Sequence, residues 1–437
     1  MEPIAVTDFR VGIDSWLPRD VSDPLEGQAH AELRIEAGGV LISEIEDILE
    51  EAVRPCFRAS AYRLAAWFVA NWWRLRWESR SDSVDWWLSH GMASAGGGYV
   101  WPDATFESDG EYVLLHSKPT TDRTVSPILY LRQASINIPA SVFEKAIDSF
   151  VDVVLARLAS VGETNSDLAQ AVAELNGERG DREVTERRKL EALLGCDAGE
   201  AEDALLDALT AAQADVGAGA VEEVAAASQR AALHVLNGIR EQLKRTDLAA
   251  SRDAIERVAQ RAKHGGPLAG LPWQRAHHMA RLARQEWGLG RGIVQDKVLA
   301  GLLELPESAL RRAAAGKSAM SAGMRKSSER ELGIVFRSPI RENRRFELMR
   351  IIGDDLIAVA SERILPATRK YTARQKFQRA FAQEVLLPEA ELLETLGNQP
   401  ADDDAIDEIA HQYQVSSMVV RTMLVNARRL PVDELAA

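Results

Sequence analysis

Three charged side chains at helical spacing are the first candidates for chemistry in this chain. Glu347, Arg350 and Asp354 lie three and four residues apart, so on a helix they share one face. Turned inward, that face would hold a positive charge between two carboxylates as a buried charge network. Turned outward, it would be a solvated trio whose pairs contribute about 0.2–0.5 kcal/mol each. The spacing leaves both interpretations open.

Other reactive motifs are weaker. Residues 316–318 (GKS) end like a phosphate-binding loop, but Arg311 occupies the position of the first required glycine. His277 and His278 lie on an amphipathic helix, where a solvated polar face is a better interpretation than a metal site. We therefore predict no catalytic residue, no metal ligand and no cofactor from these motifs.

The first 160 residues are expected to form an α+β domain. Alternating apolar residues around glycine-containing turns predict hairpins over 31–46 and 105–116, and a further strand over 127–131. Residues 60–77 predict a helix that is apolar on nearly every side and hence buried. Residues 139–160 predict an amphipathic helix.

Tryptophan is concentrated in this domain, since eight of the ten tryptophans lie in the first 101 residues. They could form an aromatic core, or some could line a ligand or peptide pocket. Trp72 and Trp73 are adjacent on the predicted helix and cannot both face one core. At least one ring is therefore expected to meet another domain or a partner.

The remaining sequence is expected to be mainly helical. Residues 161–265 are rich in Ala, Leu and Glu and predict a helical connector, followed by a linker. Residues 273–437 predict a C-terminal domain with helices over 273–290, 344–361 and 372–387 and a short strand over 333–337. The predicted fold class is thus mainly α, with α+β character in the first 160 residues.

The C-terminal part resembles the ImmA/IrrE family of zinc metallopeptidase-like bacterial proteins. Family members pair a helix reading RRFxLAHELGH with a later helix reading ExxANxFAxxLLMP, followed by a segment that contains VS. Residues 344–348 (RRFEL) match the start of the first motif, and 381–388 (FAQEVLLP) match the end of the second. Val415 and Ser416 match the tail. The resemblance covers about the last 165 residues and implies a helical peptidase-like domain with a short strand region.

The resemblance also implies that the zinc chemistry has been lost. The positions of the HELGH motif are 350–354, which read RIIGD, and the third ligand position is Gln375. Zinc hydrolysis needs two histidines, a carboxylate base and a third ligand. Arg350 has no lone pair to offer, Ile351 cannot accept a proton, and Asp354 alone is not a metal site. We therefore expect a pseudo-peptidase. One hypothesis is that Arg350 places a fixed positive charge where zinc would lie, and the alternative is the solvated surface trio.

The charge is unevenly distributed along the chain. The formal net charge is −14, yet residues 251–380 carry 26 basic and 13 acidic side chains. This block could neutralise acidic parts of the same protein, bind an acidic protein partner, or contact DNA or RNA phosphates. The candidate polyanion-binding residues are Arg311, Arg312, Lys317, Arg325, Lys326, Arg344, Arg345, Arg374 and Arg379. The loop over 316–326 is expected to be flexible and basic.

Two further patterns bear on the setting of the protein. Residues 405–430 look like a helix–turn–helix, but the acidic surroundings oppose DNA reading. Two distant cysteines, no signal-peptide pattern and no apolar stretch of about 20 residues predict a cytoplasmic protein without a membrane segment.

Together these patterns predict a non-catalytic regulatory or scaffolding protein that binds a protein partner through its peptidase-like domain. The resemblance implies bacterial stress response, mobile-element control or phage defence as the setting. The first alternative is a nucleic-acid-binding subunit that uses residues 251–380. The second is an enzyme with an unrecognised site in the N-terminal domain.

Overall fold

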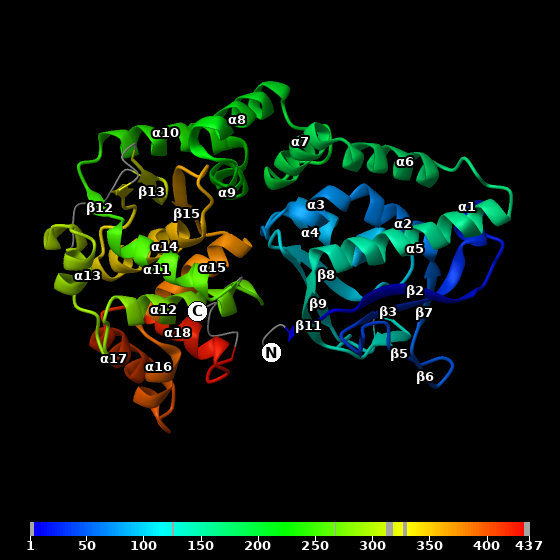
Figure 1. Ribbon diagram of the computed structural model, residues 1–437. Helices are drawn as coiled ribbons and strands as arrows, with labels where there is room; N and C mark the ends of the chain where they lie inside the picture. Colours follow the sequence, from blue (N-terminus) through cyan, green and yellow to red (C-terminus); the bar gives the residue numbers. More distant parts are fainter. Residues whose placement is uncertain (1–3, 125, 267, 312–317, 327–329, 432–437) are drawn as a thin grey trace. The chain divides into compact units, whose positions relative to one another are not determined.

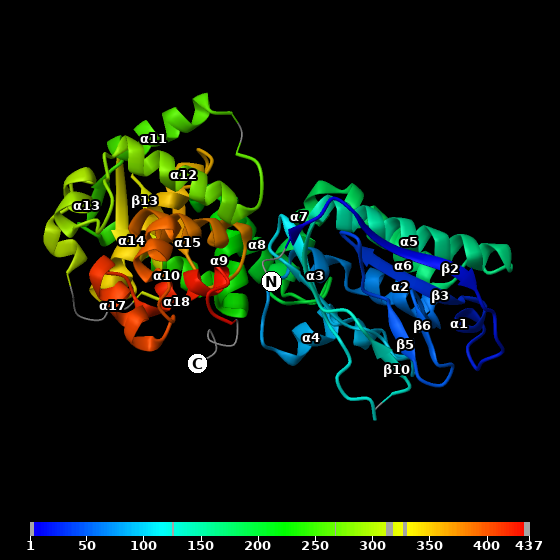
Figure 2. The same cartoon turned by 90° about the horizontal axis from the view of Figure 1, so that it is seen from below.

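The computed structural model describes residues 4–124, 126–266, 268–311, 318–326 and 330–431. The chain forms two compact units, Met1–Glu202 and Asp203–Ala437 (Figures 1 and 2). Both combine helices with small sheets, which confirms the predicted mainly helical α+β class. Among the described residues, no helix has both the length and the apolar character needed to cross a bilayer.

The strands of the first unit form three small sheets. One has the order β1-β11-β9-β8, a second has the order β10-β5-β6, and in the third β3 pairs with β2 on one side and with β4 and β7 on the other. The strand bounds are β1 Ile4–Ala5, β2 Phe9–Trp16, β3 His30–Ala37, β4 Val40–Leu41, β5 Ile45–Asp47, β6 Ala52–Arg54, β7 Phe57–Ser60, β8 Asp103–Ser108, β9 Tyr112–Lys118, β10 Ile128–Tyr130 and β11 Ala134–Pro139.

The predicted hairpins are present to different extents. Strands β8 and β9 pair antiparallel over their whole length, as predicted for 105–116, and β10 matches the predicted strand. The hairpin predicted over 31–46 is shorter, because β4 ends at Leu41. The chain then leaves this sheet, and β5 pairs with β10 and β6 instead.

Helices cover these sheets. Their bounds are α1 Pro24–Gln28, α2 Ala61–Ala70, α3 Trp72–Trp77, α4 Val84–His90, α5 Ala140–Ser160, α6 Asp167–Gly180 and α7 Arg182–Leu193. Helix α5 confirms the prediction for 139–160, whereas the helix predicted over 60–77 is interrupted at Asn71. The Asn71 side-chain amide donates to the Trp67 carbonyl oxygen at 2.8 Å, a local bond that competes with the helical pattern.

The tryptophans of the first unit are mainly core residues. Trp72 and Trp73 are both buried, contrary to the expectation that one ring would face away from this domain. Helix α6 covers them: the Trp73 indole donates to a Glu178 carboxylate oxygen at 2.8 Å, and the Arg179 guanidinium lies 4.5 Å from the Trp72 ring centroid. Trp87, in contrast, is 42% exposed.

The segment predicted as a connector, 161–265, is divided between the two units. Helix α6 packs on α2, and α7 packs on α3, so both belong to the first unit. Residues from Asp203 onward belong to the second unit. The apolar faces of these helices are therefore buried within the two units.

The second unit is a helical assembly around one antiparallel sheet with the order β12-β14-β13-β15. Its strands are β12 Ala249–Ser251, β13 Ser321–Arg325, β14 Glu331–Val335 and β15 Ile364–Ala367. Its helices are α8 Asp203–Val216, α9 Ala218–Ser228, α10 Ala232–Arg245, α11 Asp253–His264, α12 Pro272–Glu286, α13 Asp296–Leu302, α14 Arg341–Ile357, α15 Ala373–Leu386, α16 Glu389–Leu396, α17 Asp403–Tyr413 and α18 Ser417–Asn426. Short 3₁₀ turns lie at Met92–Ala95, Gln229–Ala231 and Glu307–Leu310.

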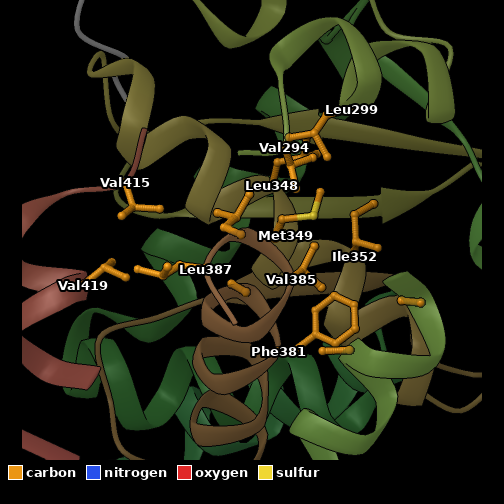
Figure 3. Packing of buried hydrophobic residues seen from close by; sticks show 14 of the residues in the cluster. Val294, Leu299, Leu348, Met349, Ile352, Phe381, Val385, Leu387, Val415 and Val419 are labelled. Atoms are coloured by element: carbon orange, nitrogen blue, oxygen red, sulfur yellow. The ribbon is translucent and has the colours of Figure 1, made fainter. Parts of the chain in front are cut away.

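Helices α14 and α15 form the centre of the second unit (Figure 3). Leu348, Met349 and Ile352 of α14 pack in one apolar cluster with Phe381 and Val385 of α15. A Cβ at Gly353 would lie 2.7 Å from the Phe381 ring, so this glycine permits the close approach of the two helices. Since α14 is buried from Glu347 to Asp355, each polar side chain in that stretch needs an internal partner.

Candidate functional site

Arg350 lies at the centre of the candidate site and is only 7% exposed. Its Nη2 donates to the Thr368 carbonyl oxygen at 2.6 Å and to the side-chain oxygen of Gln375, with a longer bond of 3.3 Å to Gln378. Burial, followed by the nearby charge of Arg379, lowers the pKa of Arg350 to about 9. The guanidinium therefore stays positively charged at neutral pH.

The two glutamines connect Arg350 to the end of strand β15. Both are fully buried, and the side-chain nitrogen of each donates to the Pro366 carbonyl oxygen, at 2.9 Å from Gln375 and 3.1 Å from Gln378. The Gln375 oxygen also accepts from the Thr368 backbone N–H at 2.9 Å. The direct acceptors of Arg350 are thus neutral oxygens.

Asp354, one turn further along α14, has a charged partner. Its two carboxylate oxygens accept from Nε and Nη2 of Arg374 at 2.7 and 2.8 Å, a bidentate ion pair with no exposure of the Asp354 side chain. Arg374 Nη1 then donates to Glu362 at 3.2 Å. Glu362 in turn accepts from the backbone N–H groups of Gly219 and Ala220 at 2.7 and 2.9 Å, at the start of helix α9.

The predicted trio therefore does not form a direct charge network. Glu347 accepts from the Ser321 hydroxyl at 2.6 Å and lies 3.7 Å from the Arg337 guanidinium, while Asp354 binds Arg374. The surface alternative is also wrong, because Glu347, Arg350 and Asp354 are all buried. The two carboxylates still favour the charged form of Arg350 through space.

The groups at positions 350, 351, 354 and 375 are unsuited to hold a metal ion. Arg350 is positive, and the apolar Ile351 is fully buried, with its Cγ2 packed against Gly323. Both oxygens of Asp354 already accept from Arg374, and the oxygen of Gln375 accepts from Arg350. A cation here would have to displace a buried arginine from its acceptors.

Sequence reasoning missed one titratable member of this cluster, Glu223 on α9. It is 5% exposed and accepts from the Thr372 hydroxyl, the N-cap of α15, at 2.6 Å. Burial raises the pKa of Glu223 to about 7, an effect that the charge of Arg374 opposes and that of Asp354 reinforces. No local pattern could reveal it, since 149 residues separate it from Thr372.

The predicted polyanion-binding residues are largely engaged inside the second unit. Arg345 is fully buried and bonds Asp296 and the Val294 carbonyl oxygen. Arg344 donates to the Ala309 carbonyl oxygen at 2.6 and 2.9 Å. Arg379 donates to the Lys370 carbonyl oxygen at 2.7 Å.

Arg325 shows this internal use best. It lies on β13, in the segment predicted as a flexible loop, and its Nε donates to Asp355 at 2.6 Å. Its other nitrogens donate to main-chain oxygens at the C-terminal end of α14, including those of Asp355 and Ala358. A cation there donates to the carbonyl groups that have no partner within the helix. It also interacts favourably with the negative end of the helix dipole.

Other members of the set lie nearer the surface or outside the described residues. Arg311 pairs with Glu307, and Lys326 lies 3.8 Å from Glu331. Arg312 and Lys317 lie outside the residues that the structure describes. The structure thus brings Arg350, Asp354, Gln375 and Arg374 together, with Arg379 close enough for its charge to act on Arg350. Arg311, Arg325, Lys326, Arg344 and Arg345 bind other partners.

A comparison of the chain with models of known protein families finds no match, and neither do comparisons with curated proteins and with solved structures.

Proposed function

We propose that the protein is a non-catalytic regulatory or scaffolding protein whose C-terminal unit is a pseudo-peptidase that binds a protein partner. This proposal rests on the ImmA/IrrE-like motifs together with the chemistry at 350, 351, 354 and 375. From the same motifs we propose a role in bacterial stress response, mobile-element control or phage defence, and from the two distant cysteines a cytoplasmic location.

One observation carries the proposal: a buried arginine occupies the position of the first zinc ligand, and its acceptors are neutral oxygens. Arg350 is held by Thr368, Gln375 and Gln378, while Asp354 is held by Arg374. Such a network fixes α9, α14, α15 and β15 in one arrangement without an ion. At positions 350, 351 and 375 it offers no carboxylate, and the carboxylate of Asp354 is occupied by Arg374.

A protein partner is favoured over nucleic acid because most described arginines of the basic block already have internal acceptors. One exposed aromatic side chain lies next to the network, with the Arg379 guanidinium 4.7 Å from its ring centroid. Tyr371, 56% exposed, directly precedes Thr372, which binds Glu223. Aromatic side chains are enriched in protein interfaces, and Tyr often contributes strongly to binding energy there.

Metal analysis of the full-length protein tests the non-catalytic part. We expect well under one equivalent of zinc, and about one equivalent after the combined change Arg350→His, Ile351→Glu, Asp354→His and Gln375→Glu. The matched control, Glu347→Gln, should not bind zinc. One equivalent of zinc in the unmodified protein, lost in Asp354→Asn, would refute the proposal.

Affinity capture from the native host tests the partner. The full-length protein should retain a specific protein after nuclease treatment, and Tyr371→Ala should reduce its recovery. Met418→Ala is the matched control, since Met418 is similarly exposed (52%) on α18. Retention that nuclease abolishes, or that 0.2 M salt removes together with DNA or RNA, would support the nucleic-acid alternative instead.

A further inference from the structure

An open groove lies between strand β2 and helix α5 in the first unit. The two elements run side by side in both overall views (Figures 1 and 2) and are in contact. The groove has a volume of about 570 Å³ and is lined by residues 7–13 and by one face of α5. That size lies within the range of about 300–1,000 Å³ typical of ligand sites.

Strand β2 is an edge strand, and alternate residues direct their backbone groups away from β3. Gly38 N–H donates to the Asp8 carbonyl oxygen at 3.2 Å, which marks a hydrogen-bonded pair. Ile35, opposite Val11, uses its carbonyl oxygen for Ile42 and its N–H for Ser43. The pair of Val11 and Ile35 is therefore not hydrogen-bonded.

By the two-residue period of a strand, the N–H and C=O groups of Phe9, Val11 and Ile13 all point toward the free edge. The described residues pair β2 with β3 alone. Edge groups of this kind are a template for an added strand.

The wall opposite this edge is apolar and regularly spaced. Val142, Ala146, Ser149 and Val153 of α5 lie three or four residues apart and line the groove, and Val153 is 48% exposed. A peptide lying between β2 and α5 could therefore bury alternate apolar side chains against the helix.

The Lys145 side chain places a positive charge in the lining of the groove. It is exposed, lines the groove and makes no ion pair with any described residue. The neighbouring carboxylates on α5 have other partners: Glu144 binds Arg76, and Asp148 binds Arg179. Arg10, also exposed, extends over Gly12 on the strand side. The lining thus contains two cations and one carboxylate, that of Asp8. Its net positive charge complements an acidic ligand.

We propose that the β2–α5 groove binds an extended peptide segment of a partner protein, which adds to β2 as a further strand. Its side chains alternate between apolar residues, packed on Val142, Ala146 and Val153, and acidic residues that meet Lys145 and Arg10. This site lies in the first unit and does not rest on the function proposed for the second.

Selection from a displayed library of random ten-residue peptides on the full-length protein tests the site. We expect enrichment of alternating apolar and acidic residues. A fluorescein-labelled enriched peptide should bind about tenfold or more weakly to Ser149→Trp, which fills the groove, and more weakly to Lys145→Glu. Ala156→Trp, exposed on the same helix but outside the lining, should bind like the unmodified protein.

Hydrogen exchange identifies the mode of binding. Peptide binding should slow exchange in fragments that cover Phe9–Trp16, because the added strand accepts from the free N–H groups of β2. Failure to enrich any peptide relative to Ser149→Trp overturns the proposal. So does enrichment without protection of β2. A concentration-dependent dimer that protects β2 without any peptide would show that a second copy is the occupant and would overturn it too.

Discussion

The pH dependence of stability should report directly on Glu223. Its pKa is raised from 4.5 to about 7 by burial, with Asp354 reinforcing and Arg374 opposing the shift. Between these values the folded protein keeps a proton that the unfolded chain has lost, so the free energy of unfolding falls as pH rises. Glu223→Gln keeps the shape of the protonated acid and removes the titration.

The magnitude follows from the size of the shift. One pKa unit corresponds to about 1.4 kcal/mol, so the full effect is about 3 kcal/mol and is complete above pH 7. Part of it is already lost at pH 5, which leaves a change of about 2–3 kcal/mol between pH 5 and pH 8. The stability of Glu223→Gln relative to the unmodified protein should therefore rise by that amount over this interval.

Urea unfolding at pH 5, 6, 7 and 8, followed by far-UV circular dichroism, measures this difference. The other groups facing Glu223 are Arg350, Arg374, Arg379 and Asp354, and they are the same in both proteins. Glu241→Gln on α10, about half exposed, is the control and should change stability by less than about 0.5 kcal/mol at every pH. A constant difference between Glu223→Gln and the unmodified protein from pH 5 to pH 8 would refute the reasoning.

Two further predictions concern the same network. Asp354→Asn leaves the Arg374 guanidinium without its bidentate carboxylate and should lower the free energy of unfolding by about 3–5 kcal/mol in urea titrations; an effect below 1 kcal/mol would contradict the ion-pair geometry. Gly219→Ala places a Cβ 2.7 Å from Arg374 Nη1 and should lower the melting temperature, whereas the control Gly238→Ala, with open space in α10, should leave it unchanged or raise it. Equal melting temperatures for the two alanine variants would contradict the close contact.

Local patterns in the sequence predicted the elements that local interactions form. The hairpin of β8 and β9 was predicted from its turn, where the Asp109 side chain accepts from two following N–H groups. Helix α5 was predicted from its apolar spacing, which corresponds to the face it buries. In both cases the sequence pattern itself is local, although the face of α5 packs against distant elements such as β2 and α2.

Strand β14 overlaps the strand predicted over 333–337, but β13 and β15 lack such signals. β13 reads SAGMR and β15 reads ILPA, and neither alternates clearly between apolar and polar residues. Their pairing depends on each other and on β14, and Arg325 on β13 is stabilised by Asp355, 30 residues away. The segment 316–326, with three basic residues and small side chains, thus looked like an exposed loop, although Arg325 is buried.

The sequence predicted which residues make up the candidate site, but it did not predict their hydrogen-bond and ion-pair partners. The motif alignment located Arg350, Asp354 and Gln375, and the structure brings all three together. The partners of Asp354 and Arg350 come from α15 and the end of β15, and Glu362 reaches α9, more than 140 residues away in sequence. Spacing along α14 suggested Glu347 as a partner, yet the fold directs that carboxylate to Ser321.

In the network around Arg350, Glu223 is the group whose charge changes near neutral pH. Arg350 and Arg374 carry two positive charges, and Asp354 and Glu362 carry two negative ones, so these four groups balance. Glu223, in contact with Thr372 beside them, holds a proton near pH 7 because burial disfavours its charged form, an effect that Asp354 reinforces and Arg374 opposes. The arrangement needs no metal ion for charge balance, and adding a divalent cation would upset that balance unless an arginine left. A zinc-binding variant of this site would therefore need added negative charge, such as glutamates at positions 351 and 375, as well as histidines at 350 and 354.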